Sequence, residues 1–177
     1  MDRQKPWLNS YPEQVPREID LTRYRSVVQM LEEACERFRH RSAFSNRLKI
    51  FERHLTYQQL DELSQAFACY LVHELKLKKG DRVAIMLPNV LQYPVALFGT
   101  LRAGMVVVNV NPMYTPRELK HQLADSGAAA IVVLDNFAGT LTKILAETQI
   151  RHSVTTALAD LFGGFKGPLI NFIAKYI

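Results

Sequence analysis

Three short apolar runs, separated by stretches with helical spacing, constrain the fold of this chain more than any other feature. The runs lie at residues 82–88, 105–110 and 129–134, and turn-forming residues bound each of them. A short apolar run of this kind is typical of a buried strand. A strand, a helix and a strand within about 30 residues form a βαβ unit with parallel strands. The pattern therefore predicts an α/β fold in which helices flank a parallel sheet.

The stretches between these runs carry helix start and stop signals. Residues 89–104 fit a helix that ends at Gly104. Pro94 is compatible with that helix if it lies in the first turn, and otherwise it would kink the helix. The next helix has a well-defined start, because three residues match the N-cap, N1 and N3 positions: Thr115, Pro116 and Glu118. We expect a further helix over residues 137–148 and a last strand within 151–156.

The N-terminal part of the chain predicts an arm, a helix and a hairpin. Residues 1–22 contain Pro6, Pro12 and Pro16, which disfavour helix, so we expect an extended arm. Its apolar residues Trp7, Tyr11 and Val15 are candidates to pin the arm to the body. Apolar residues then recur at helical spacing over 24–38, and 42–46 and 49–57 favour a β-hairpin.

A long helix is predicted to begin after Thr56. Thr56 and Gln59 have the spacing of a capping box, in which each side chain bonds the backbone N–H of the other residue. The apolar positions that follow have helical spacing, and lysines precede Gly80, where a helix C-terminus favours positive charge. We therefore expect this helical segment to extend toward Gly80.

The last residues predict an unfinished element. Residues 169–177 place apolar side chains at helical spacing, and the sequence stops within that periodicity. We expect a single incomplete domain. It comprises an extended arm (1–22), an α/β body (23–155), and a loop with the start of an amphipathic helix (156–177).

Composition excludes several classes of protein. Hydrophobic residues make up 48% and charged residues 22%, as in globular proteins. No apolar stretch reaches the roughly 18 residues of a membrane span, and the polar start is not a signal peptide. The net charge is +5, but the basic residues are scattered, which argues against nucleic acid. The cysteines, Cys35 and Cys69, form no metal-binding pattern, so we expect small buried residues in a cytoplasmic protein.

No motif in the sequence identifies a catalytic site. The sequence lacks a dinucleotide-binding glycine pattern, a P-loop, a nucleophile elbow and a metal-ligand cluster. Ligands of open α/β sheets bind beyond the carboxyl ends of the strands, and there Asn111 and Tyr114 are the candidate ligand-adjacent residues. The competing interpretation is architectural, because the same turn already has the residues of a turn and a helix cap.

Several segments together resemble the adenylate-forming superfamily. "LTYQQL" (55–60) is similar to its first core motif and "LRAGMVVVNVNP" (101–112) to its second. "KKGDRVAIMLPN", "LQYPVALFGTLRAG" and "VNVNPMYTPRELKHQLADSGA" resemble the bacterial long-chain fatty acyl-CoA synthetases of β-oxidation, as do both ends of the chain. The resemblance implies the first part of the large N-terminal domain of such an enzyme.

The resemblance also implies a reaction in two steps, in which MgATP activates a long-chain fatty acid and coenzyme A then displaces AMP. The family's phosphate loop, adenine motif and catalytic lysine lie beyond residue 177, as does its C-terminal lid domain. We therefore expect ATP, Mg²⁺ and coenzyme A to serve the whole protein, and no cofactor, metal or catalytic residue in this fragment alone. Contact with the cytoplasmic face of the inner membrane and a homodimer are compatible with the resemblance. The alternative is a non-catalytic module that binds a membrane or a partner.

Overall fold

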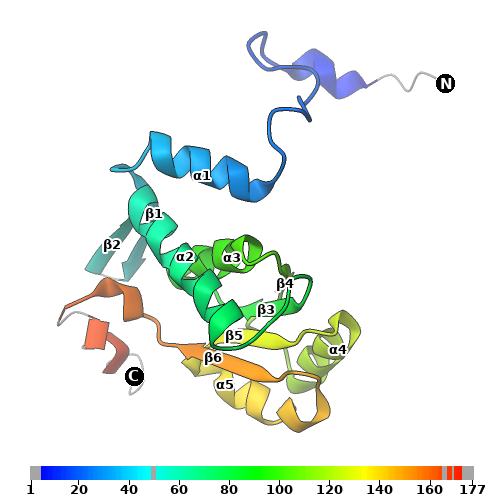
Figure 1. The fold of residues 1–177 in the computed structure, drawn as a ribbon, viewed down its shortest axis with the longest axis vertical. Helices are drawn as coiled ribbons and strands as arrows, with labels where there is room; N and C mark the ends of the chain where they lie inside the picture. The colour runs from blue at the N-terminus through cyan, green and yellow to red at the C-terminus, as the bar shows by residue number, and fades with distance from the viewer. Residues whose placement is uncertain (1–4, 49–50, 165–166, 169, 173–177) are drawn as a thin grey trace.

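The computed structural model describes residues 5–48, 51–164, 167–168 and 170–172 (Figure 1). Its centre is a parallel sheet in the order β4-β3-β5-β6. The strands are β3 (Arg82–Met86), β4 (Val106–Asn109), β5 (Ala130–Leu134) and β6 (His152–Thr156). All three pairings are parallel. The predicted α/β fold is confirmed, and each predicted apolar run forms a strand.

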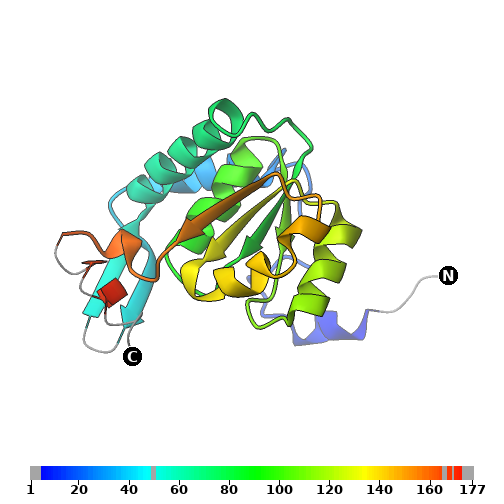
Figure 2. The same cartoon turned by 90° about the horizontal axis from the view of Figure 1, so that it is seen from below.

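Helices cover both faces of the sheet (Figures 1 and 2). Two of them, α2 (Tyr57–His73) and α3 (Gln92–Arg102), pack on one face. The other face is covered by α4 (Pro116–Ser126) and α5 (Asp135–Thr142). The central strand supplies both cores, because successive side chains of a strand point to opposite faces. Val83 and Ile85 join the first core, while Ala84 and Met86 join the second.

A smaller layer precedes the sheet. Helix α1 (Val27–Arg37) packs through Leu31 and Cys35 against Leu60 of α2. Next in the chain, β1 (Ser42–Leu48) and β2 (Phe51–Thr56) form the predicted antiparallel hairpin. Helices α1 and α2 thus attach the hairpin and the N-terminal residues to the body.

The predicted helix starts are confirmed in detail. Thr56 and Gln59 form a reciprocal capping box at α2, and Thr115 and Glu118 form another at α4, where Pro116 is the first helical residue. Pro94 lies in the first turn of α3, where the N–H that proline lacks is not needed within the helix.

Two predicted helix ends are wrong. Helix α2 ends at His73 rather than near Gly80, because Lys76 adopts the left-handed conformation (φ 53°) and turns the chain. The N–H of Leu77 then bonds the carbonyl of Leu71, and Leu77 enters the core. The helix predicted over 137–148 begins at Asp135 and ends at Thr142, and a 3-10 turn, η2 (Leu145–Glu147), follows it.

Two burial predictions are also wrong. The apolar residues of the arm do not pin it to the body: Trp7, in the short 3-10 helix η1 (Pro6–Ser10), is exposed, as are Tyr11 and Val15. Cys69 is exposed, unlike Cys35, because it lies on the solvent side of α2 while the neighbouring Leu71 faces the core.

The segment after β6 is described in part. A 3-10 turn, η3 (Asp160–Phe162), contributes Phe162 to a small core with Ala159 and Ile170. Most of the apolar face predicted over 169–177 lies outside the described residues. Within the described ranges, no helix combines the length and the apolar character that crossing a bilayer requires.

The contact between α2 and α3 predicts a position that cannot accept a side chain. A Cβ on Gly99 would lie 2.8 Å from Phe67 Cδ1 and 2.9 Å from the carbonyl oxygen of Ser64. We expect Gly99→Ala to lower the free energy of unfolding by about 1–3 kcal/mol, as in other overpacked cores. Urea denaturation would measure the loss. The matched control is Gly139→Ala in α5, where a Cβ meets nothing within 4 Å, so that change should be neutral or stabilising. Equal effects of the two changes would contradict the prediction.

Candidate functional site

The carboxyl edge of the sheet holds a set of polar side chains that bond one another. At the end of β4, the Asn109 side-chain oxygen accepts a hydrogen bond from the hydroxyl of Tyr93 at 3.0 Å. The backbone oxygen of the same residue accepts from Gln122 Nε2 at 2.9 Å. These contacts join the first turn of α3, the end of β4 and the side of α4. They hold the loop after β3 and the loop after β4 next to each other.

The predicted ligand-adjacent residues lie in the turn between β4 and α4. Asn111 is exposed, and its side-chain oxygen accepts a hydrogen bond from the backbone N–H of Met113 at 3.0 Å. Tyr114 is half-buried against the core beneath α4, and its N–H donates to the carbonyl of Asn111 at 3.1 Å. These bonds give both residues a role in the turn. A ligand role for them stays a prediction.

Gln92 is the buried polar residue that connects this edge to the end of β6. Its Nε2 donates to the carbonyl of Ala157 at 2.7 Å and lies 3.3 Å from Thr156 Oγ1. Asp160 accepts from the Thr156 hydroxyl at 2.8 Å and from the Ala157 N–H at 2.7 Å. A buried polar group needs such partners, so the loop after β6 is held to the start of α3.

Three further hydrogen bonds attach two neighbouring segments to the same edge. The Asn171 amide donates to Asp160 Oδ1 at 2.9 Å, and its oxygen accepts from the Ala159 N–H at 2.7 Å. From the hairpin, Asn46 Nδ2 donates to the carbonyl of Asn89 at 2.9 Å. The edge is therefore built mainly of bonds within the protein.

The helix starts among the described residues are poorly suited to the phosphates of a nucleotide. Phosphate sites on helices use free N–H groups at the N-terminus, and the side chains of Ser26, Thr56 and Thr115 each take one of these groups in α1, α2 and α4. The start of α5 carries the carboxylate of Asp135, which repels an anion. In the first turn of α3, Pro94 has no N–H to offer. We therefore derive no chemical step on a nucleotide at these loops.

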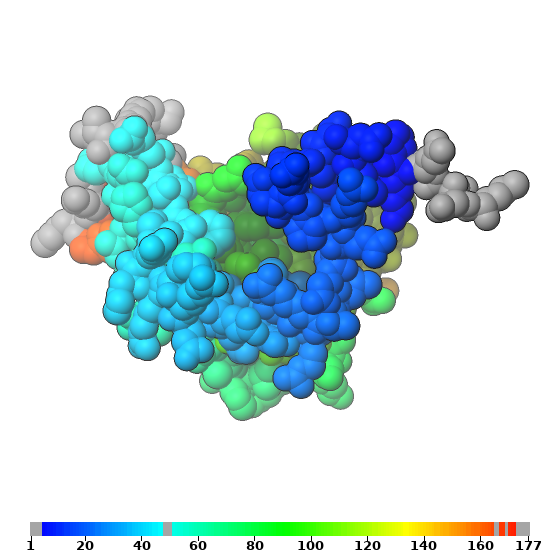
Figure 3. All heavy atoms as spheres, turned by 90° about the horizontal axis from the view of Figure 1, so that it is seen from above, coloured from blue at the N-terminus to red at the C-terminus, as the bar shows by residue number. Residues whose placement is uncertain are grey.

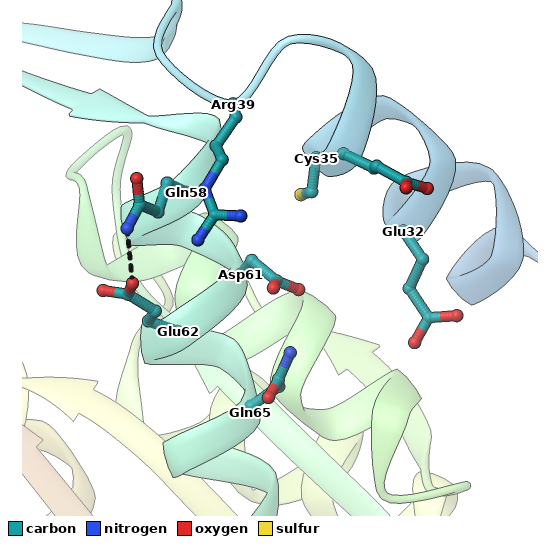
Figure 4. Close-up of a pocket in the computed structure, with 8 residues that line it drawn as sticks. Glu32, Cys35, Arg39, Gln58, Asp61, Glu62 and Gln65 are labelled. Carbon is teal, nitrogen blue, oxygen red and sulfur yellow. Dashed lines mark hydrogen bonds between the residues drawn. The ribbon is translucent and has the colours of Figure 1, made fainter.

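A second candidate is a cavity of about 310 Å³ between α1 and α2 (Figure 4). Charged groups and one thiol line it: Glu32, Cys35, Glu36, Arg39, Asp61 and Glu62. The Glu62 carboxylate accepts from Gln58 at 2.8 Å, and Asp61 pairs with Arg102. Asp61 and Glu62 thus bond different partners, as expected for adjacent residues of a helix. Among the described residues, no group of His, Cys, Asp and Glu could hold a metal ion.

The thiol in this cavity is poorly suited to nucleophilic chemistry. Burial raises the pKa of Cys35, and the nearby carboxylate of Asp61 raises it further. Reactive cysteines require the opposite, a lowered pKa in electropositive surroundings. The surroundings of Cys35 therefore do not favour a nucleophilic role for its thiol.

Arg102 is the structural centre beside this cavity. Its side chain is only 8% exposed, and it pairs with Asp61 of α2 and, at 2.9 Å, with Glu32 of α1. One buried guanidinium thus joins three helices. Reasoning from the sequence missed both Arg102 and Gln92. The available indication was their polarity within the mainly apolar stretch 90–105.

Comparison with protein families matches residues 31–167 to the AMP-binding enzymes. The long-chain-fatty-acid–CoA ligase of Yersinia pestis is 55% identical over 98% of this chain, and that of Escherichia coli O157:H7 is also 55% identical over 98%. The ligase of Bacillus subtilis is 37% identical over 90%. The chain spans 28–30% of the length of these relatives.

Solved structures agree on the fold. A long-chain-fatty-acid-CoA ligase from Archaeoglobus fulgidus superposes with a TM-score of 0.66 at 21% identity, covering 84% of this chain and 30% of that one. The N-terminal domain of FACL13 from Mycobacterium tuberculosis gives 0.67 at 22% identity, covering 75% and 34%. At these identities the likeness concerns the fold alone.

The position of Arg102 predicts a loss of stability when its charge is removed. Arg102→Met leaves two carboxylates without their partner, but Glu32 and Asp61 are 54% and 32% exposed, which moderates the effect. We expect the free energy of unfolding to fall by about 1–3 kcal/mol, measured by urea denaturation. Arg47→Met, in the exposed pair with Glu52, is the control and should change it by less than about 1 kcal/mol. A larger loss in the control than in Arg102→Met would disprove this role.

The capping box of α4 predicts that the pKa of Glu118 depends on Thr115. The Thr115 hydroxyl, and then its backbone N–H, hold the pKa of Glu118 below its ordinary value. The contact therefore stabilises α4 above the ordinary pKa of glutamate, and this contribution is lost as the pH falls through the lowered pKa. Thr115→Val should raise the pKa of Glu118, as measured by NMR titration of the carboxyl carbon. Thr155→Val, on β6, should leave it unchanged, and a shift of equal size there would refute the assignment.

Proposed function

The chain belongs to the AMP-binding enzyme family, and on that premise we propose that it is the N-terminal portion of a long-chain fatty acid–CoA ligase. The observation that carries the proposal is the 55% identity with the Yersinia pestis ligase over 98% of the chain. Identity at that level across the whole chain, including the arm, supports the long-chain branch over the other ligases of the family. The activity belongs to a whole protein of which this chain spans 30% of the length.

In that whole protein, ATP activates the fatty acid as an acyl-adenylate with release of pyrophosphate, and coenzyme A then displaces AMP. Mg²⁺ neutralises the phosphate charge. We assign no catalytic residue to residues 1–177 and propose that this portion is inactive alone. Asn111 and Tyr114 would approach a ligand only if the rest of the protein completes the site.

The proposal includes a domain organisation and a cellular setting. Residues 1–177 form part of one larger domain, with the arm at 1–22 and the α/β body at 23–155. The setting is the cytoplasm, with peripheral contact to the inner membrane and a homodimer as further elements. The net charge of +5 supports attraction to anionic lipid.

The competing function is a non-catalytic module that binds a membrane or a partner. Its sequence basis is the apolar face at 169–177, most of which lies outside the described residues. The exposed apolar side chains of the arm are the described observation in its favour. A module of this kind would act without the rest of a ligase, which separates the two proposals experimentally.

A chimeric ligase, called the joined protein below, tests the ligase proposal. Residues 1–177 replace the corresponding part of the Yersinia pestis ligase, and formation of acyl-CoA from a long-chain fatty acid, MgATP and coenzyme A is measured. We expect activity within about tenfold of the unaltered ligase, while the 177-residue chain alone gives no heat with MgATP in calorimetry. A folded joined protein without activity, or clear ATP binding by the chain alone, would count against the proposal.

A further inference from the structure

The N-terminal arm exposes several large apolar side chains that the described residues leave uncovered. Ile19 is 86% exposed and Leu21 is 85% exposed. Trp7, Tyr11 and Val15 are exposed as well. A single exposed apolar side chain is ordinary, but a succession along one segment marks a surface that is covered by something else. Figure 3 shows the arm (dark blue) beside a hollow that separates it from the hairpin (cyan).

The arm has little attachment of its own to the body. Among the described residues, the hydrogen bonds of residues 5–24 all join groups at most three positions apart, such as Thr22 to Asp20. Pro6, Pro12 and Pro16 restrict the backbone of this segment, which forms the short helix η1 and a series of turns. A segment whose backbone is already restricted by prolines loses less conformational entropy when it docks.

The relatives indicate where the covering surface comes from. The AMP-binding family match begins at residue 31 and leaves the arm out. The alignment with the Yersinia pestis ligase takes in 98% of the chain, so the arm is shared with a protein more than three times longer. The arm is thus a feature of the long-chain ligases beyond the part common to the family.

We propose that the arm docks on the polypeptide that long-chain ligases carry after the region matched by this chain. This inference rests on the proposed function. The apolar side chains of Ile19 and Leu21 supply the buried contact. Because both segments belong to one chain in a ligase, docking occurs at a high effective concentration and needs no tight intrinsic affinity.

Charge argues for a protein surface over a lipid surface. Residues 5–24 contain three basic and three acidic side chains: Lys5, Arg17, Arg23, Glu13, Glu18 and Asp20. Segments that bind anionic lipid carry a cluster of about four to eight basic residues without compensating acids. Asp20 also lies between Ile19 and Leu21, where insertion into hydrocarbon would bury a carboxylate.

Limited proteolysis of the joined protein tests the docking. Trypsin cleaves after Arg17 and Arg23, and both sites are exposed in the 177-residue chain. We expect cleavage in the joined protein to be about tenfold slower than in the chain alone. The double change Ile19→Ser with Leu21→Ser should abolish this protection and lower the Tm of the joined protein, but leave the Tm of the chain alone unchanged. Val72→Ser, at an exposed apolar position of α2, is the control and should retain the protection.

The outcomes separate this inference from the proposed function. Equal cleavage rates in an active joined protein would overturn the docking and leave the function standing. A protected arm in an inactive joined protein would support the docking and reject the function. Protection of the chain alone that rises with protein concentration, or that appears with vesicles of anionic lipid, would overturn the docking in favour of a second copy or a membrane.

Discussion

The burial of β3 on both faces is the constraint on which the rest of the structure depends. Val83, Ala84, Ile85 and Met86 are each at most 1% exposed, so this strand needs a helix layer above and below it and a strand on either side. The helices α2 and α3 cover one face of β3, and α4 and α5 cover the other. The four-stranded order follows because β4 and β5 cover the two edges of β3.

The N-terminal elements are attached by apolar packing and by the two ion pairs of Arg102. Gly99 lets α3 approach α2 closely, and Arg102, one turn further along α3, reaches both α2 and α1. Close packing at Gly99 and ion pairing at Arg102 thus both stabilise the interface between α2 and α3. The cavity between α1 and α2 is polar because the carboxylates that meet Arg102 line it, which gives its charge a structural explanation.

The sequence predicted those features whose cause is local. Apolar runs identified the strands of the sheet, and the capping boxes at Thr56 and Thr115 were predicted because an N-cap depends on residues three positions apart. The end of α2 was missed, since Leu77 draws the chain into a core that only the folded sheet creates. Gln92 and Arg102 were missed for the same reason: their partners lie 64 and 70 residues away in sequence. The turn at Asn111 and Tyr114 was located correctly, while the ligand role of these residues stays a prediction.

The strand order has a consequence for synthesis on the ribosome. The centre of the sheet is made first: β3 and β4 emerge before β5, although β5 occupies the other edge of β3. Until β5 has emerged, β3 therefore presents an unpaired edge on a strand whose side chains after Arg82 are apolar and buried in the folded protein. Such edges are the usual templates for intermolecular pairing. The hydrogen bond from Gln92 to Ala157 forms later still, so the sheet stays open to intermolecular pairing until the segment after β6 has also emerged.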